Sequence, residues 1–182
     1  LMVALSDFWL LHGFKPTEEL IYTLLNVVEL RELLPIFNHS GYSGLYKHVM
    51  MISQEEVNRI LQPLLDNLAV ANKESEPDRF DEDYWVAKAA ASFNKNGNID
   101  RGIFSIYLFN LVHLKKGEGI FQLTGVPHAY LEGQNVEIMA NSDNVLRGGL
   151  TTKHIDVPEL LKHTKCEATY PSILSGEEIG TH

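Results

Sequence analysis

Residues 128–151 read HAYLEGQNVEIMANSDNVLRGGLT, and this stretch decides the fold class. Three short runs rich in apolar residues, HAYL, VEIMA and VLRGGLT, are separated by the turn-forming sequences EGQN and NSDN. Short strands at intervals of roughly 8–12 residues, with Gly, Asn and Asp in the turns, are typical of antiparallel sandwiches and barrels. The stretch therefore predicts an antiparallel β structure.

Strand-like runs also lie on both sides of this stretch. Residues 3–11 are apolar and short enough for one strand. Residues 106–114 (IYLFNLVHL) form a buried run, and residues 119–123 (GIFQL) fit a further short strand. Residues 166–170 (CEATY) fit one more. These runs extend the predicted antiparallel structure in both directions along the chain.

Between these strand signals, the apolar residues follow helical spacing up to about residue 94. One helix is expected to begin at Thr17, because the two glutamates that follow it suit the first turn of a helix. A second helix is expected after the cap-like Ser53, and a third over the alanine-rich residues 83–93. Residues 72–83 are expected to form a polar loop before the third helix.

The whole pattern predicts an α+β chain in which a helical module is inserted between a first strand and a run of antiparallel strands. The expected boundaries are residues 1–14 for the strand, 15–97 for the helical module and 98–182 for the β module. The β module also contains a short predicted helix over residues 156–163, with Asp156 as its N-cap.

Composition excludes several classes of protein. The formal net charge of −9 argues against a nucleic-acid partner, since phosphate backbones need a basic surface. A membrane span is not expected, because no run of 18 apolar residues occurs. The single cysteine, Cys166, cannot form an internal disulfide and fits a reducing, cytoplasmic location. Histidines other than His128, His12 among them, show no ligand spacing and are expected at the surface or as satisfied core residues.

The sequence EGQN between HAYL and VEIMA predicts a tight hairpin with Gly133 in its turn. In the simplest register the facing pairs are Leu131–Val136, Tyr130–Glu137 and His128–Met139. Side chains alternate along a strand and cross-strand partners share a face, so His128, Tyr130 and Glu137 are expected on one side of the ribbon. From geometry alone, a solvated face of an ordinary hairpin is the commoner explanation of such a trio.

Further polar residues follow in the same segment. Arg147 and Lys153 would share a face of a straight strand but lie about 20 Å apart, too far to hold one phosphate. The Gly148–Gly149 pair permits a bend or bulge that would bring them nearer. Asp143 lies in a turn, where aspartate is common for structural reasons. The occurrence of all these residues in one segment strengthens the case for a functional site.

Three long motifs, GVPHAYLEG, VEIMANSDNVLRGGLTTKHIDVPELL and LMVALSDFWLLHGF, resemble the type I mannose-6-phosphate isomerases. The resemblance is strongest from Gly117 to Leu161 and is loose over residues 15–97, which match the family's helical domain in position and character. It implies a pair of cupin-like β-sandwich or jelly-roll modules with an inserted helical domain. It also implies a zinc enzyme that interconverts mannose 6-phosphate and fructose 6-phosphate through an enediolate.

The resemblance also implies a role for each matching residue. The histidine of the Pro-His-Ala-Tyr motif, here His128, is a zinc ligand in the family. The arginine of the Ser-Asp-Asn motif, here Arg147, is catalytic. The substrate pocket takes its lining from the matching tyrosine, glutamate, aspartate and lysine, which in this chain are Tyr130, Glu137, Asp143 and Lys153. The catalytic base is not identified by these matches.

The family's other zinc ligands lie upstream of the matching part: a glutamine and a histidine separated by one residue, and a glutamate ending a His-Lys-Pro-Glu stretch. Leu1 resembles the residue that follows that glutamate. We therefore expect an internal piece of a protein about twice as long, lacking the N-terminal part and the last C-terminal strands. Catalytic zinc sites usually keep three protein ligands, so this chain by itself is expected to be inactive and to bind zinc weakly or not at all.

Two other functions fit the sequence. One is a non-catalytic, sugar-binding cupin module that works without zinc. The other is a related zinc-dependent sugar isomerase with a different substrate. In each case the expected partner is a small sugar or sugar phosphate, and the sequence does not predict an oligomeric state.

Overall fold

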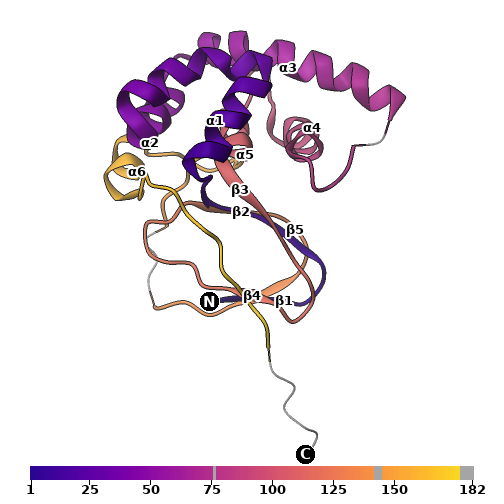
Figure 1. Ribbon diagram of the computed structural model, residues 1–182, viewed down its shortest axis with the longest axis vertical. Helices are drawn as coiled ribbons and strands as arrows, with labels where there is room; N and C mark the ends of the chain where they lie inside the picture. Colours follow the sequence, from indigo (N-terminus) through magenta and orange to yellow (C-terminus); the bar gives the residue numbers. More distant parts are fainter. Residues whose placement is uncertain (76, 142–144, 177–182) are drawn as a thin grey trace, which may run out of the picture.

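The computed structural model describes residues 1–75, 77–141 and 145–176. Helices gather at one end of the molecule and the strands of two antiparallel sheets lie at the other, which confirms the α+β class (Figure 1). In chain order the elements are β1 (Met2–Ala4), β2 (Phe8–Phe14), α1 (Thr17–Asn26), the 3-10 helix η1 (Val28–Leu33), α2 (Leu34–Met51), α3 (Gln54–Glu74), α4 (Glu82–Phe93), α5 (Gly102–Leu108), β3 (Phe109–Leu114), β4 (Gly119–Ile120), β5 (His128–Glu132), β6 (Asn135–Glu137), α6 (Val157–His163) and β7 (Ile173–Leu174).

Each of the two sheets contains one of the N-terminal strands, β1 or β2, away from its edges. One sheet has the order β6-β1-β4-β7 and the other has the order β3-β2-β5. In the second sheet Trp9 pairs with His113 of β3, while His12 pairs with His128 of β5. In the first sheet Met2 pairs with Ile120 on one side and with Glu137 on the other. Strands β1 and β2 therefore each lie between two partners that come from the second half of the chain.

Strand β2 is buried on both faces because each face packs against a different layer. Phe8 and Leu10 join a core between the two sheets, together with Met2 and Ala4 of β1. Trp9, Leu11 and Phe14 point the other way and join the large core beneath the helices. Alternation along the strand separates Phe8 and Leu10 from Trp9 and Leu11, and the register shift between Leu11 and Phe14 brings Phe14 to the side of Leu11.

Local capping signals place several helix starts. The Ser53 hydroxyl accepts a hydrogen bond from the backbone N–H of Glu56, and the Asp156 carboxylate accepts one from the backbone N–H of Glu159. Both predicted caps are confirmed. Helix α1 begins at Thr17, as predicted, although its cap position is Pro16 and makes no side-chain hydrogen bond.

The predicted hairpin between β5 and β6 is wrong. Strand β5 pairs with β2 and strand β6 pairs with β1, so the two runs belong to different sheets. The turn between them lies against the β1–β2 connection, where Leu5 N–H donates to the Gln134 carbonyl and Gln134 N–H donates to the Ser6 hydroxyl. A Cβ on Gly133 would lie 2.6 Å from the Asp7 carbonyl oxygen, so glycine is needed for this close approach.

Other strand predictions need correction. Residues 3–11 form parts of two strands with a bend at residues 5–7, and residues 145–151 form no strand. The buried run 106–114 is the end of helix α5 followed by strand β3. Only Ala168 of the run 166–170 makes a strand-like contact, a single bridge to Phe14. Helix α3 also extends to residue 74, into the predicted polar loop.

The Gly148–Gly149 pair explains the loss of the predicted strand over residues 145–151. A Cβ on Gly149 would lie 2.4 Å from the Cα of Gly102, and one on Gly148 would lie 2.6 Å from the Tyr46 hydroxyl. The Asp100 carboxylate accepts hydrogen bonds from the backbone N–H groups of Gly102 and Leu150. The segment is therefore held against the start of α5 instead of joining a sheet.

Candidate functional site

The polar residues of β5 face the space between the two sheets. Tyr130 is the pairing partner of Leu10, and His128 is the partner of His12. Leu10 belongs to the core between the sheets. Since paired residues share a face, the side chains of His128, Tyr130 and His12 also point between the sheets.

Glu137 reaches the same space from the opposite sheet, through its pairing with the inward-facing Met2. Its carboxylate lies near enough to Tyr130 to affect the phenol. Burial raises the pKa of Tyr130 to about 12, and the negative charge of Glu137 adds to this shift. The structure thus brings Tyr130 and Glu137 together, as expected from the sequence, but it does so across two sheets instead of one hairpin.

Tyr130 is fixed by two further contacts. Its hydroxyl donates a hydrogen bond of 3.0 Å to the side-chain carbonyl of Gln122, and its ring meets the ring of Phe8 edge-on at a centroid distance of 5.3 Å. Tyr130 is therefore a held hydroxyl donor at the mouth of the space between the sheets.

His128 is exposed and has one ring nitrogen already engaged. Its Nδ1 lies 3.1 Å from the Val126 carbonyl oxygen, so Nδ1 carries the proton and donates, while Nε2 keeps its lone pair. A backbone carbonyl on the far nitrogen is the usual partner of a metal-ligating histidine. This geometry fits the zinc ligand expected at His128.

His12 is the residue that the sequence analysis missed. It is 4% exposed, and neither ring nitrogen has a hydrogen-bond partner. Burial lowers the pKa of His12, and the neighbouring His128 lowers it further. The expectation of a surface or satisfied core histidine is wrong for this residue. Its pairing with a residue far along the chain leaves no spacing signal in the sequence.

Arg147 lies at a different face of β5. It lines a cavity of about 350 Å³ together with Tyr130 and Leu131 of β5 and with Trp85 and Lys88 of α4. Helix α4 lies on the side of the sheet that Trp9 and Leu11 face. Arg147 therefore lies on the helix side of the sheet, whereas the side chains of His128 and Tyr130 point between the sheets.

The remaining two expected site residues are Lys153 and Asp143. Lys153 is exposed, and its backbone N–H donates to the Thr151 hydroxyl at 3.2 Å. Asp143 lies outside the described residues.

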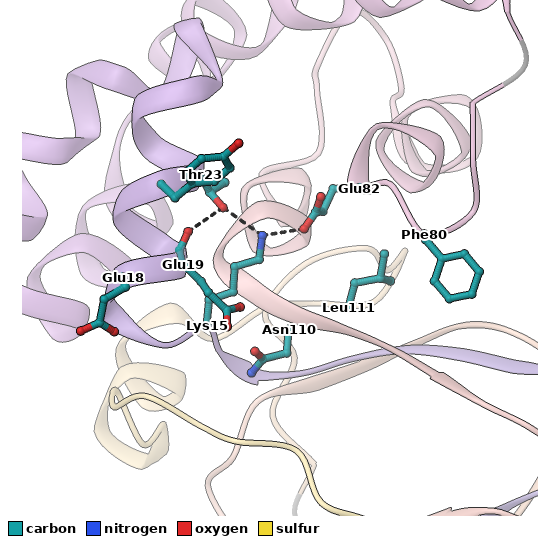
Figure 2. Close-up of a pocket in the computed structure, with 9 residues that line it drawn as sticks. Lys15, Glu18, Glu19, Thr23, Phe80, Glu82, Asn110 and Leu111 are labelled. Atoms are coloured by element: carbon teal, nitrogen blue, oxygen red, sulfur yellow. Dashed lines mark hydrogen bonds and ion pairs between the residues drawn. The ribbon is translucent and has the colours of Figure 1, made fainter.

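A second cavity, of about 470 Å³, lies between α1, the start of α4 and strand β3 (Figure 2). Its central feature is the buried Lys15, whose ammonium lies 2.6 Å from the Glu82 carboxylate and 3.0 Å from the Thr23 hydroxyl. No signal in the sequence predicted this ion pair. It joins the end of β2 to the start of α4.

Among the described residues, no helix is long and apolar enough to cross a membrane. No group of three or more His, Cys, Asp or Glu side chains within residues 1–75, 77–141 and 145–176 is placed to hold a metal ion.

Comparison with known proteins shows that the chain is similar to mannose-6-phosphate isomerases. The chain is 34% identical to the mannose-6-phosphate isomerase of Shigella flexneri over 92% of its own length, and 34% identical to the human mannose-6-phosphate isomerase over 89%. The resemblance inferred from the sequence motifs is confirmed. The chain spans 41% and 42% of the length of these two relatives. No protein-family model matches the chain.

Solved structures of mannose-6-phosphate isomerases are similar to this chain in fold. The mannose 6-phosphate isomerase of Salmonella typhimurium, bound to fructose 6-phosphate and zinc, superposes with a TM-score of 0.71 at 31% sequence identity. The superposition covers 92% of this chain and 41% of that one. Zinc is thus the metal of these homologous structures.

Proposed function

We propose that this chain is part of a mannose-6-phosphate isomerase, which interconverts mannose 6-phosphate and fructose 6-phosphate. The observation that carries the proposal is similarity to such enzymes, in sequence and in fold, over nine-tenths of the chain. The finer architecture proposed is a cupin-like jelly roll, with the boundaries 1–14, 15–97 and 98–182. The single cysteine supports a cytoplasmic location.

The proposed zinc ligand within this chain is His128, because its Nε2 is free while Nδ1 is held by the Val126 carbonyl. Zinc, when bound, supplies a Lewis acid for the sugar oxygens. Tyr130 is proposed to donate its hydroxyl to the substrate, since a phenol is protonated near neutral pH and contacts with Gln122 and Phe8 fix its position. Glu137 would accept hydrogen bonds from sugar hydroxyls that enter the space between the sheets.

Arg147 is proposed as the catalytic cation that stabilises the enediolate negative charge. Its place in the cavity that Tyr130 also lines supports this role. Asp143 and Lys153 complete the proposed substrate pocket, with Lys153 as a phosphate contact.

The test uses a longer reading frame that extends upstream of Leu1 and downstream of His182. We expect the encoded protein to convert mannose 6-phosphate to fructose 6-phosphate and to lose this activity with a chelator. We expect Arg147→Ala to lower kcat by about 10²–10³, since it removes one charge-stabilising group. Arg59→Ala is the matched control, because Arg59 is an exposed arginine of α3 paired with Glu56 and Glu32.

Three outcomes would count against the proposal. Turnover by the 182-residue chain itself would mean that the upstream zinc ligands are wrongly assigned. A longer protein that binds mannose 6-phosphate without turnover or metal would favour the non-catalytic sugar-binding module. Preference for another sugar over mannose 6-phosphate would identify a related isomerase of different specificity.

A further inference from the structure

The side-chain amide of Gln122 bridges the two sheets. Gln122 lies two residues beyond Ile120 of β4, whose side chain belongs to the core between the sheets. Side chains alternate along an extended chain, so Gln122 points to the same side as Ile120. Its neighbours Phe121 and Leu123 are 56% and 55% exposed, as expected for residues that point the other way. The amide therefore meets Tyr130, which enters the same space from β5 of the other sheet.

One end of this amide is engaged, and the other has no hydrogen-bond partner within the described residues. Oε1 of Gln122 accepts the bond of 3.0 Å from the Tyr130 hydroxyl, whereas Nε2 is buried and unpaired. A buried donor without a partner destabilises a fold, and this cost opposes what the bond to Tyr130 contributes. An apolar side chain of the same length would avoid the cost. Stability alone therefore does not account for an amide at this position, whereas control of the Tyr130 hydroxyl does.

The Tyr130 hydroxyl has a second acceptor within reach, the carboxylate of Glu137. A phenol has one proton to donate, and a hydrogen bond to a carboxylate is roughly twice as strong as one to a neutral acceptor. Without Gln122 the proton would therefore go to Glu137. The bond to Gln122 and the edge-on contact with Phe8 hold it elsewhere. The Glu137 carboxylate then keeps free lone pairs facing the space between the sheets.

We propose that Gln122 is a positioning residue that holds the Tyr130 hydroxyl away from Glu137 and so keeps the Glu137 carboxylate free for a sugar hydroxyl. The inference rests on the proposed function, which assigns substrate contacts to Tyr130 and Glu137. A sugar hydroxyl can donate to the carboxylate and accept from a neighbouring donor at the same time. A neutral acceptor also releases the Tyr130 hydroxyl to an arriving substrate more readily than a carboxylate does.

The test compares Gln122→Met with the unsubstituted longer protein in turnover of mannose 6-phosphate. Methionine is close to glutamine in length and lacks the oxygen acceptor. We expect KM to rise about 3- to 10-fold, because the substrate must now break a hydrogen bond between Tyr130 and Glu137. The kcat should stay nearly unchanged, as for any loss of uniform binding. Gln62→Met is the matched control, since Gln62 is an exposed glutamine of α3 bonded to Asp66.

A double-mutant cycle shows whether Gln122 acts through Tyr130. In the Tyr130→Phe background there is no hydroxyl to hold, so Gln122→Met should no longer raise KM. Effects on KM that simply add would overturn the proposal. The ¹³Cζ resonance of Tyr130, identified by its loss in Tyr130→Phe, gives a second readout that needs no turnover. It should shift in Gln122→Met at a fixed neutral pH, because the hydroxyl changes its acceptor.

Stability separates this role from a structural one. Gln122→Met removes the unpaired amide, so the midpoint of urea denaturation should stay the same or rise. A lower midpoint, an unchanged KM or an unmoved Tyr130 resonance would each overturn the proposal. The proposed isomerase fails on a separate observation, the absence of turnover by the unsubstituted longer protein. In that case the Tyr130 resonance and the denaturation midpoint still decide whether Gln122 holds the hydroxyl.

Discussion

The ammonium of Lys15 lies 2.6 Å from the carboxylate of Glu82, and the two side chains are 8% and 27% exposed. The two charges therefore differ in burial: the Lys15 ammonium is buried, while the Glu82 carboxylate keeps contact with water. Removing one partner from a buried pair is costly because the remaining charge is left without compensation. The cost should depend on which partner remains.

We expect Glu82→Gln to destabilise the chain more than Lys15→Met. Glu82→Gln leaves a buried ammonium, at a cost of about 3 kcal/mol in the free energy of unfolding. Lys15→Met removes the buried charge and leaves a partly hydrated carboxylate, so its cost should be about 1–2 kcal/mol. Urea denaturation measures both. Equal costs, or a larger cost for Lys15→Met, would show that the ammonium is better hydrated than its burial indicates.

Gly13→Ala is expected to be strongly destabilising, whereas Gly97→Ala is expected to be mild. Both glycines have a positive φ, +62° and +77°. A Cβ on Gly13 would lie 2.3 Å from the Thr169 hydroxyl oxygen, while one on Gly97 has nothing within 4 Å. The left-handed backbone costs about 1–2 kcal/mol at either site, and only Gly13 adds the clash. Thermal denaturation of the two variants separates the cost of the left-handed backbone from the cost of the clash. Similar melting temperatures for the two variants would contradict the crowding at Gly13.

Glu132 is expected to make the chain sensitive to acid. Ion pairs with Lys88 and then Arg79 lower the pKa of Glu132 below its ordinary value. A carboxyl group with a lowered folded pKa stabilises the fold above its unfolded pKa of about 4.3, and this stability is lost as pH falls through the folded pKa. The effect at neutral pH should be under about 1 kcal/mol, because the pair is partly exposed. Glu132→Gln should flatten the dependence of unfolding free energy on pH between about pH 5 and 3, and an unchanged slope would exclude the pairing.

Asp83 is expected to have the opposite effect. Burial raises the pKa of Asp83, although the hydroxyl of Tyr107 donates a hydrogen bond of 2.5 Å to it. A raised folded pKa means that the folded state holds the proton more tightly, so stability falls as pH rises from about 3.9 through the folded pKa. Asp83→Asn should remove this fall while keeping an acceptor for Tyr107. Urea denaturation between pH 4 and 7 tests it, with Glu132→Gln as the control of opposite sign.

Local signals in the sequence were sufficient to predict several of the helix starts. Ser53 and Asp156 were predicted as caps because a capping hydrogen bond spans only three residues. The helix that ends at Leu108 was missed because its residues are buried on every side. A run that is apolar all round has no periodicity to distinguish a helix from a strand.

Long-range pairing limited the prediction of the site. The proximity of Tyr130 and Glu137 was expected, but from a hairpin that does not form. Their true positions depend on β1 and β2, which lie more than a hundred residues earlier and give no local signal. His12 was missed for the same reason. The role proposed for Arg147 came from family resemblance and not from any pattern of spacing.

The position of β1 and β2 between late partners has a consequence for the order in which the chain folds. Within the described residues, their ladder partners all lie in β3 to β6, from Phe109 onward. At a synthesis rate of about 5–20 residues per second, β1 and β2 are made roughly 5–20 s before any of these partners. The helices between them can form during this interval. Sheet assembly must then close a long loop, which makes it the slow step and leaves two apolar strands exposed to chaperones or aggregation meanwhile.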